Sequence, residues 1–299
     1  MINNDLVSVV VVAYNAEDTI LETLESIKNQ SYQNIELVVT DDCSKDKTVG
    51  ICKKWIDENK GRFVNTQLLT VEKNTGVCAN GNRGRFAATG KWLKGIAGDD
   101  ILLPNCIQDF MFYANEHRDI EIISSFMKVY NNTFDEANCI DAQKAYSKLE
   151  IFNADTQTQK IAMANNLLVY APSVIYTKHL FETVGGFEDT YSFEDYPFFL
   201  SALEHGFKIH FLRKATVGYR VHQSLCHSSG QLFKYKFQLD VRKFKKDRCF
   251  KYLSKRRING IKKCWKLQDF FEEHGMNKNN SFYHFMYWKT IALINKIWS

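Results

Sequence analysis

The chain has 299 residues, of which 45% are hydrophobic and 24% are charged, and only 3 are prolines. This composition excludes a disordered or collagen-like protein, and the length suits one large domain or a main domain with an appendage. The net charge of +5 is uneven, because residues 231–270 carry fourteen Lys/Arg and three Asp, a net +11, which leaves −6 for the rest and indicates an anionic partner for the basic segment.

The N-terminal part of the chain alternates between predicted strands and helices. Val7–Ala13 is a nearly continuous run of β-branched residues, typical of a strand buried on both faces of a parallel sheet. Asn15 is a good helix N-cap, and apolar residues recur at helical spacing from Ile20 to Ile27. Residues 35–39, 66–71 and 92–97 are predicted strands, and residues 48–55 and 77–88 are predicted helices. This order predicts an α/β fold with a Rossmann-like, mostly parallel central sheet and helices on both faces.

Beyond residue 120 the pattern is mixed. We expect strands near residues 121–130, near Val174 and at residues 208–212, and helices at residues 177–184 and from Asp195 to about residue 204. Gly185-Gly186-Phe187 is a predicted turn between the two helices, and Gly206 is a predicted C-cap. The main domain is expected to close near Cys226.

Polar residues follow four of the predicted strands directly. They are Tyr14-Asn15, Asp41-Asp42, Asn74-Thr75-Gly76 and Gly98-Asp99-Asp100. Each group alone is also compatible with a helix cap or a turn. Because the carboxyl ends of parallel strands meet at one edge of a sheet, four such groups together favour a ligand site at that edge.

Two acidic pairs predict chemistry. Asp99-Asp100 closes an apolar strand, and adjacent carboxylates suit Mg²⁺ or Mn²⁺ shared with a diphosphate; the alternative is an N-cap for a helix near Leu102. Glu194-Asp195 lies between Phe193 and an aromatic run, where partial desolvation favours a general base. The alternative for this pair is an N-cap with an acid in the first turn of a surface helix.

A third element is Tyr219-Arg220-Val221-His222. A neutral imidazole at His222 would complete a metal shell, and Arg220 would pair with a phosphate. The alternative is a structural histidine.

In this order the motifs resemble the family-2 glycosyltransferases with the GT-A fold, over about residues 7–228. Residues 8–15 resemble the opening strand and nucleotide-binding turn, residues 39–48 the second strand with the aspartate that contacts the base, and residues 74–84 the nucleotide-side helix. Residues 97–100 resemble the metal-binding DxD region, residues 185–187 with Glu194-Asp195 the acceptor-side segment, and Tyr219 to His222 the closing motif.

The resemblance implies roles for individual residues. Asp195 is the expected catalytic base, with Glu194 and Gly186 on the acceptor side, and Asp99, Asp100 and His222 are the expected metal ligands. The expected nucleotide-sugar-binding residues are Ala13, Tyr14, Asn15, Asp41, Asn74, Gly76, Asn80, Arg83, Asp99 and Arg220.

The activity that the resemblance implies is inverting transfer from a nucleoside-diphosphate sugar, most often a UDP-sugar in the family, with Mn²⁺ or Mg²⁺ as cofactor. The acceptor would be a lipid-linked intermediate of a bacterial surface polysaccharide such as O-antigen or capsule. Two positions depart from the family pattern. The first acid of the DxD region falls on Ala97, and an arginine common in the nucleotide-side helix falls on Gly81, for which Asn80 or Arg83 would compensate.

The predicted domain organisation is a glycosyltransferase domain at residues 1–228, with a nucleotide-sugar half at 1–104 and an acceptor half at 105–228. Residues 229–299 form a basic, aromatic-rich helical appendage that would associate with a membrane or mediate a homodimer. Phe233, Phe237, Val241 and Phe244 share one helical face, and residues 282–298 are interrupted by lysines, so both segments are expected to lie on a bilayer. Packing of the aromatic face against the catalytic domain is the alternative.

The expected location is the cytoplasm, on the inner face of the cell membrane. The eight cysteines have no disulfide or zinc spacing, and no apolar segment is long enough to span a bilayer. A signal peptide is not expected, because no basic n-region precedes the first strand.

Three rival functions remain at this stage. A nucleotidyltransferase would carry a glycine-rich, basic loop after the first strand, which residues 13–17 do not resemble. A nucleic-acid-binding protein would explain the basic appendage but not the acidic pairs at strand ends, so we expect no nucleic acid as partner. The departures at Ala97 and Gly81 also leave a catalytically inactive relative open.

Overall fold

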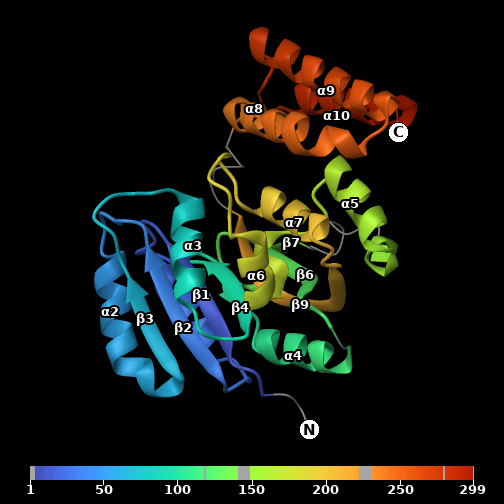
Figure 1. Cartoon of the computed structure of the whole chain (residues 1–299). Helices are drawn as coiled ribbons and strands as arrows, with labels where there is room; N and C mark the ends of the chain where they lie inside the picture. Colours follow the sequence, from blue (N-terminus) through green and yellow to red (C-terminus); the bar gives the residue numbers. More distant parts are fainter. Residues whose placement is uncertain (1–3, 118, 141–148, 222–229, 279, 299) are drawn as a thin grey trace. The chain divides into compact units, whose positions relative to one another are not determined.

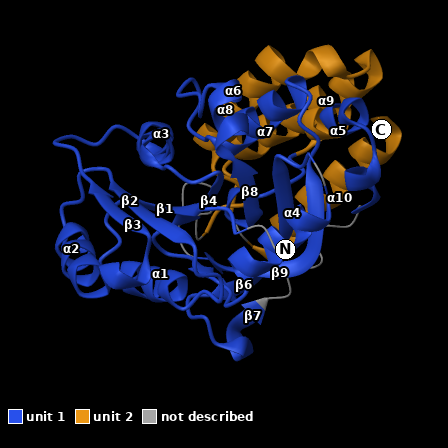
Figure 2. Ribbon diagram, turned by 60° about the horizontal axis from the view of Figure 1, so that its bottom comes forward, with its two compact units in different colours: residues 1–160, 167–221 blue, residues 161–166, 222–299 orange. Residues whose placement is uncertain are grey.

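The fold begins with the run of β-branched residues at β1 (Val7–Ala13), of which all but one are buried. In this computed structural model the described residues are 4–117, 119–140, 149–221, 230–278 and 280–298. Two compact units are present, one of residues 1–160 and 167–221, and the other of residues 161–166 and 222–299 (Figure 2).

The first unit is built around one sheet in the order β3-β2-β1-β4-β8-β6-β9-β5, with β7 paired to β6 (Figure 1). The other strands are β2 (Ile35–Asp41), β3 (Asn65–Leu69), β4 (Trp92–Ala97), β5 (Ile101–Leu102), β6 (Ile122–Asn131), β7 (Cys139–Ile140), β8 (Val174–Thr177) and β9 (His210–Val221). The pairs within β3-β2-β1-β4 are parallel, as is β6-β9, whereas β8 is antiparallel to both neighbours and β5 is antiparallel to β9. Strands β3, β2, β1 and β4 therefore form a continuous parallel part of a mixed sheet.

The connection from β4 to β5 shows that the sheet curls. Only residues 98–100 join Ala97 to Ile101, a span of at most about 14 Å. In the order of pairing β8, β6 and β9 come between β4 and β5, which would be about 19 Å in a flat sheet. The strands must therefore bend round until β5 lies near the end of β4, and this bend brings Asp99 and Asp100 close to β9.

Helices cover both faces of the sheet in the first unit (Figure 2). They are α1 (Ile20–Lys28), α2 (Thr48–Asn59), α3 (Val77–Ala87), α4 (Cys106–Glu116), α5 (Thr156–Asn165), whose last residues belong to the second unit, α6 (Lys178–Val184) and α7 (Asp195–Glu204). The main core joins alternate residues of β1 and β2 to the apolar faces of α1, α2 and α4. On the other face, α3 packs against β1 and β2 at Gly84.

Most of the predicted elements are confirmed, including the strand at β1 and the helix from Asp195. The prediction that Asn15 caps the first helix is wrong. Helix α1 begins at Ile20 after Thr19, and Asn15 instead has a φ of 49°, a left-handed conformation that Asn tolerates better than most residues. The apolar spacing from Ile20 marked the helix correctly, and the loop between β1 and α1 is longer than a cap at Asn15 would allow.

The described part of the second unit contains three long helices, α8 (Tyr235–Phe244), α9 (Lys255–Glu273) and α10 (Ser281–Trp298). Phe233, Phe271 and Tyr287 form its small core, with the Phe233 and Tyr287 ring centroids 5.3 Å apart. Phe233, which precedes α8, and Phe244 are buried, and Phe237 and Val241 are partly buried. The prediction that these four residues form one helical face on a bilayer is therefore wrong, because Phe233 lies outside the helix and packs with Phe271 and Tyr287.

The exposed apolar surface of this unit belongs to α10 instead. Phe282, Phe285 and Leu293 are 65%, 60% and 57% exposed, and Tyr287 on the opposite face of the helix is buried. Among the helices in the described residues, none has both the length and the apolar composition needed to cross a membrane.

The close approach of α3 to the sheet can be tested at Gly84. A Cβ there would lie 2.5 Å from Val10 Cγ1 and 2.9 Å from Thr40 Cγ2, so Gly84→Ala should lower the free energy of unfolding by about 1–3 kcal/mol. Gly50 in α2 is the matched control, since a Cβ there meets nothing within 4 Å. Gly50→Ala should raise the free energy of unfolding by about 0.5–1 kcal/mol. Chemical denaturation measures both, and equal effects would contradict the packing.

Candidate active site

The residues at the ends of β1 and β2 that were predicted to bind the nucleotide sugar form one hydrogen-bonded network. The Ala13 carbonyl accepts from the Asp42 N–H at 3.1 Å and from the Asn80 side-chain amide at 3.1 Å. Asp41 accepts from the Ser44 N–H at 2.8 Å and also from the Ser44 hydroxyl. Sequence reasoning placed these residues at one sheet edge, and the hydrogen bonds join them there.

The loop after β1 is tied to the loop after β2 through Asn15. The Asn15 N–H donates to the Ser44 hydroxyl at 2.8 Å, and its Oδ1 accepts from the Lys45 N–H at 2.9 Å. Tyr14 beside it is 49% exposed. The left-handed turn at Asn15 thus leaves an aromatic ring at the surface of the network, where a planar base can stack.

Asp42 organises the loop that leads into α3. Its carboxylate accepts from the Thr75 N–H at 2.8 Å, the Thr75 hydroxyl at 2.6 Å, the Gly76 N–H at 2.7 Å and Arg83 at 3.3 Å. Burial raises the pKa of Asp42, but these hydrogen bonds outweigh it and hold the pKa below its ordinary value. Asn74 adds a side-chain bond to the Gly76 N–H at 3.2 Å, and Gly76 has a φ of 90°.

Asn80 and Arg83 complete this network from α3. The Asn80 Oδ1 accepts from Arg83 at 2.9 Å and from the Thr40 hydroxyl at 2.6 Å. Arg83 also donates to the Thr75 hydroxyl at 2.8 Å. Both predicted donor-binding residues therefore lie beside Asp42, and Arg83 is the positive charge of this part of the site.

Asp99 and Asp100 lie between β4 and β5 and are held from β9 by Arg220. The Arg220 N–H donates to the Asp100 carboxylate at 2.9 Å, and its Nε donates to the Asp99 carbonyl at 2.9 Å. Burial and the charge of Asp99 raise the pKa of Asp100 well above its ordinary value, although Arg220 and Lys94 oppose this. The Arg220 guanidinium also contacts Glu22, so it is engaged with protein groups rather than being a free phosphate ligand.

His222, the third expected metal ligand, lies outside the described residues. Within the described residues, no three His, Cys, Asp or Glu side chains form a cluster that could hold a metal ion. Carboxylates are hard oxygen ligands of the kind that Mg²⁺ and Mn²⁺ take. Asp99 is partly exposed and fits such an ion directly, whereas Asp100 is 1% exposed and its carboxylate accepts from the Arg220 N–H.

Glu194 and Asp195 begin α7, where an aromatic run follows them. Both residues are partly exposed to solvent, but protein atoms surround their carboxyl groups closely enough to desolvate them. Desolvation first, and the charge of Glu194 second, raise the pKa of Asp195 to about 7, and burial also raises the pKa of Glu194. Burial is the largest cause of the raised pKa of Cys78, about 11, and the charges of Glu194 and Asp195 add to it. This places the acidic pair near the first turn of α3, next to the loop that Asp42 holds.

The turn at Gly186 is joined to α3 by Asn82, which sequence reasoning missed. The Asn82 Oδ1 accepts from the Phe187 N–H at 2.7 Å, and its amide donates to the Phe187 carbonyl at 2.9 Å. Gly186 has a φ of 82°, and a Cβ there would lie 2.8 Å from Asn82 Oδ1. Helix α3 therefore connects the donor-side network to the predicted acceptor side.

Two buried cations were also missed. Lys94 in β4 is fully buried, and its Nζ donates to the Gly95 and Pro172 carbonyls at 2.9 and 2.5 Å. Burial lowers the pKa of Lys94 to about 8. Arg85 in α3 is buried as well. A lysine in a strand and an arginine in a helix carry no signal in a single sequence, because both residue types are common on surfaces.

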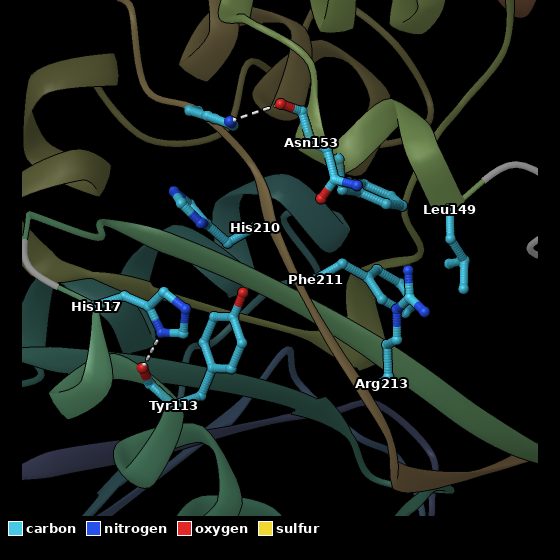
Figure 3. Close-up of a pocket in the computed structure, with 9 residues that line it drawn as sticks. Tyr113, His117, Leu149, Asn153, His210, Phe211 and Arg213 are labelled. Carbon is cyan, nitrogen blue, oxygen red and sulfur yellow. Dashed lines mark hydrogen bonds between the residues drawn. The ribbon is translucent and has the colours of Figure 1, made fainter.

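A pocket of about 240 Å³ lies at the other end of β9, away from the predicted site residues (Figure 3). Its lining residues are Tyr113, His117, Leu149, Phe152, Asn153, Lys208, His210, Phe211 and Arg213. Burial, followed by the charges of Lys208 and His117, lowers the pKa of His210 to about 4. Strand β9 begins at His210 and reaches Arg220 at its far end, so this pocket is separate from the acidic residues described above.

A family comparison decides the class of protein. The family model described as "Glycosyl transferase family 2" matches residues 8–174, more than half of the chain. The chain belongs to glycosyl transferase family 2. The match spans the network at the ends of β1, β2 and β4.

Three curated proteins are similar to this family 2 glycosyltransferase. The putative glycosyltransferase EpsE of Bacillus subtilis is 32% identical over 125 residues, which are 42% of this chain and 44% of EpsE. An uncharacterized glycosyltransferase of Haemophilus influenzae is 26% identical over 264 residues, 85% of this chain and 76% of that protein. The minor teichoic acid biosynthesis protein GgaB of Bacillus subtilis is 27% identical over 170 residues, 53% of this chain and 18% of GgaB. The chain thus spans less than half of the length of EpsE.

Solved structures confirm the GT-A fold of this family 2 glycosyltransferase. S. aureus TarS 1–349 in complex with UDP-GlcNAc has a TM-score of 0.59 and 23% identity, covering 75% of this chain and 62% of that one. Mannosyltransferase PcManGT from Pyrobaculum calidifontis, in complex with GDP-Man and Mn²⁺, has a TM-score of 0.55 and 17% identity, covering 74% of this chain and 58% of that one.

The hydrogen bonds to Asp42 predict a pH-dependent contribution to stability. Because the pKa of Asp42 is lowered in the folded protein, its contribution is present at neutral pH and is lost as the pH falls below about 4. Asp42→Asn should lower the free energy of unfolding by about 2 kcal/mol at pH 7, and the difference from the unchanged protein should shrink at pH 3. Asp57→Asn, on the exposed face of α2, is the control. A constant difference at all pH values would contradict the role of the charge.

Proposed function

We propose that the chain is an inverting glycosyltransferase that moves a sugar from a nucleoside-diphosphate sugar, a UDP-sugar, to a hydroxyl of a lipid-linked glycan. The observation that carries this proposal is the Glu194–Asp195 pair, where burial raises the pKa of Asp195 to about 7 near the first turn of α3. A carboxyl with such a pKa accepts a proton at neutral pH more readily than an ordinary aspartate.

Asp195 is the general base in this mechanism. Its carboxylate takes the proton of the acceptor hydroxyl while that oxygen forms a bond to the anomeric carbon of the donor. The bond from the anomeric carbon to the diphosphate breaks, and its electron pair leaves with the diphosphate. Attack from the side opposite the leaving group inverts the configuration, and no glycosyl-enzyme is formed. Glu194 and the turn at Gly186 would border the acceptor.

The network around Asp42 would hold the nucleotide. Asp41, at the end of β2, would contact the base, and the exposed Tyr14 with Asn15 would line the base and ribose. Asn74 and Gly76 would present the loop before α3, and Asn80 and Arg83 would extend the network toward the phosphates. TarS was solved with UDP-GlcNAc, which supports a UDP-sugar as the donor.

Asp99 and Asp100, with His222, would hold a Mn²⁺ or Mg²⁺ ion. When bound, such an ion supplies charge neutralisation for the leaving diphosphate. Arg220 fixes the two aspartates through their backbone and carboxylate groups, so its proposed contribution to diphosphate binding is mainly through that loop. PcManGT was solved with Mn²⁺, which supports this cofactor.

Residues 229–299 would bring the enzyme to the inner face of the cell membrane, where lipid-linked acceptors lie. Residues 230–298 carry seventeen Lys/Arg and five Asp/Glu, a net +12, which attracts an anionic leaflet. The outer face of α10 presents Phe282, Phe285 and Leu293 to solvent, with Lys289 and Lys296 among them, a composition typical of interfacial helices. The name of GgaB, which refers to teichoic acid biosynthesis, supports an acceptor of the cell surface.

Substitution of Asp195 tests the proposed chemistry. Asp195→Asn should lower the kcat of sugar transfer by about 10²-fold or more and leave nucleoside-diphosphate binding unchanged. In the unchanged enzyme kcat should rise with pH through about 7, because the ionised form of Asp195 is the active one. Release of nucleoside diphosphate from a panel of nucleotide sugars, with Mn²⁺ or Mg²⁺ present, is the measurement.

Asp189→Asn is the matched control, since Asp189 is an exposed aspartate on the loop that precedes α7 and should retain full activity. Sugar transfer that survives Asp195→Asn would sink the assignment of the base. Binding without turnover of any donor would indicate an inactive relative, and salt-sensitive RNA binding would favour the nucleic-acid alternative.

The exposed face of α10 can be tested by vesicle binding. A combined Phe282→Ser, Phe285→Ser and Leu293→Ser variant should bind phosphatidylglycerol vesicles at least about 10-fold more weakly, because each change removes apolar surface that would enter the bilayer. Val64→Ser, which changes an apolar residue of the first unit that is 61% exposed, is the control. Vesicle flotation measures both. Unchanged flotation together with loss of a dimer would favour the dimerising alternative.

A further inference from the structure

Arg85 is a buried charge that the mechanism above does not use. Only 8% of its surface is exposed. Its guanidinium donates to two uncharged oxygens, the Tyr176 hydroxyl at 2.6 Å and the Gly81 carbonyl at 3.0 Å. It also lies over the Phe187 ring, 4.6 Å from the centroid. Because a guanidinium stays protonated in proteins, a full positive charge is held inside the first unit.

Two glycines make room for this guanidinium. A Cβ at Gly95 would lie 2.0 Å from the Arg85 NH2 atom, and one at Gly81 would lie 3.1 Å from its NH1 atom. Gly81 is the position at which the resemblance led us to expect an arginine. The guanidinium of Arg85, one turn further along α3, lies against Gly81 instead. Asn80 and Arg83, the residues expected to compensate, bond with the Asp42 network.

The contacts of Arg85 reach the first turn of α7 through two aromatic rings. Tyr176 and Phe187 each pack on Phe198, with ring centroids 5.0 Å apart in both pairs. The Phe198 N–H in turn donates to the Glu194 carbonyl at 3.3 Å. Arg85 thus braces the turn that carries both carboxylates.

The charge of Arg85 also acts on the acidic pair. Burial raises the pKa of Glu194, and the charge of Arg85 opposes that effect. The other ionisable groups that interact with the pair are Cys78 on α3 and Tyr176 on β8. Neither is a cation, and Lys94 on β4 is a further buried cation close enough to be affected by Arg85.

We propose that Arg85 is a positioning residue for the reaction: it braces the first turn of α7 and supplies the charge that keeps Glu194 ionised. Asp195 is then the carboxylate of the pair that is left to accept the proton of the acceptor. This inference rests on the proposed role of Asp195 as base. It assigns a function to a residue outside the network that binds the donor.

Two substitutions at position 85 separate the charge from the hydrogen bonds. Arg85→Lys keeps the positive charge and loses the planar fork, whereas Arg85→Met loses both. The pH dependence of kcat should keep its acidic limb near 7 in Arg85→Lys. In Arg85→Met the limb should move down by about one pH unit or more, because Glu194 then takes up a proton and no longer places a like charge beside Asp195. Glu194→Gln with Arg85 intact should move it down, since the like charge is removed.

A kcat that falls equally at all pH values in Arg85→Met would overturn the electrostatic role, and so would a limb that moves to higher pH, because Glu194 would then stay ionised without Arg85. An equal shift in Arg85→Lys and Arg85→Met would overturn it as well.

A second measurement does not depend on turnover. At pH 8, Arg85→Met should destabilise the chain more when Glu194 is present than in the Glu194→Gln background, by chemical denaturation. Equal destabilisation in both backgrounds would refute the coupling. Turnover that survives Asp195→Asn would refute the proposed base and leave this coupling standing, so the two failures are distinguishable.

Discussion

The site depends on one packing constraint, the close approach of α3 to β1 and β2. Gly84 permits this approach, because any side chain there would meet Val10 and Thr40. With α3 so placed, its first turn lies near the acidic pair, and Asn80 and Arg83 reach the network at the ends of β1 and β2. A single helix therefore contacts both groups of residues that we propose bind the donor and the acceptor, and a shift of α3 would disturb the two groups together.

Buried charge is the second organising feature. Asp42 is stabilised as a carboxylate by several donors, so its pKa is low, whereas Asp195 is desolvated beside a like charge and its pKa is raised to about 7. The same residue type therefore has a structural role in one place and is suited to proton transfer in the other. Glu194 and Arg85 set the electrostatic environment of Asp195. A single aspartate at the start of a helix would lack this environment.

The parallel half of the fold was predictable from the sequence, because β1 and its neighbours are short apolar runs followed by polar residues. The curl of the sheet was not, since it follows from how few residues join β4 to β5 and from pairing between distant strands. Among the proposed site residues, Asp41, Asp99 and Asp195 could be selected by position and residue type. Asn82 and Arg85 could not, because their roles come from tertiary contacts that no local pattern indicates.

The stereochemistry of transfer tests the central claim most directly. Once a donor with an α-linked sugar is found, the anomeric proton of the first product can be followed by NMR at early times. A single general base, Asp195, and direct attack on the donor predict a β-linked product. An α-linked product would contradict the account, because retention requires a covalent intermediate or attack from the side of the leaving diphosphate.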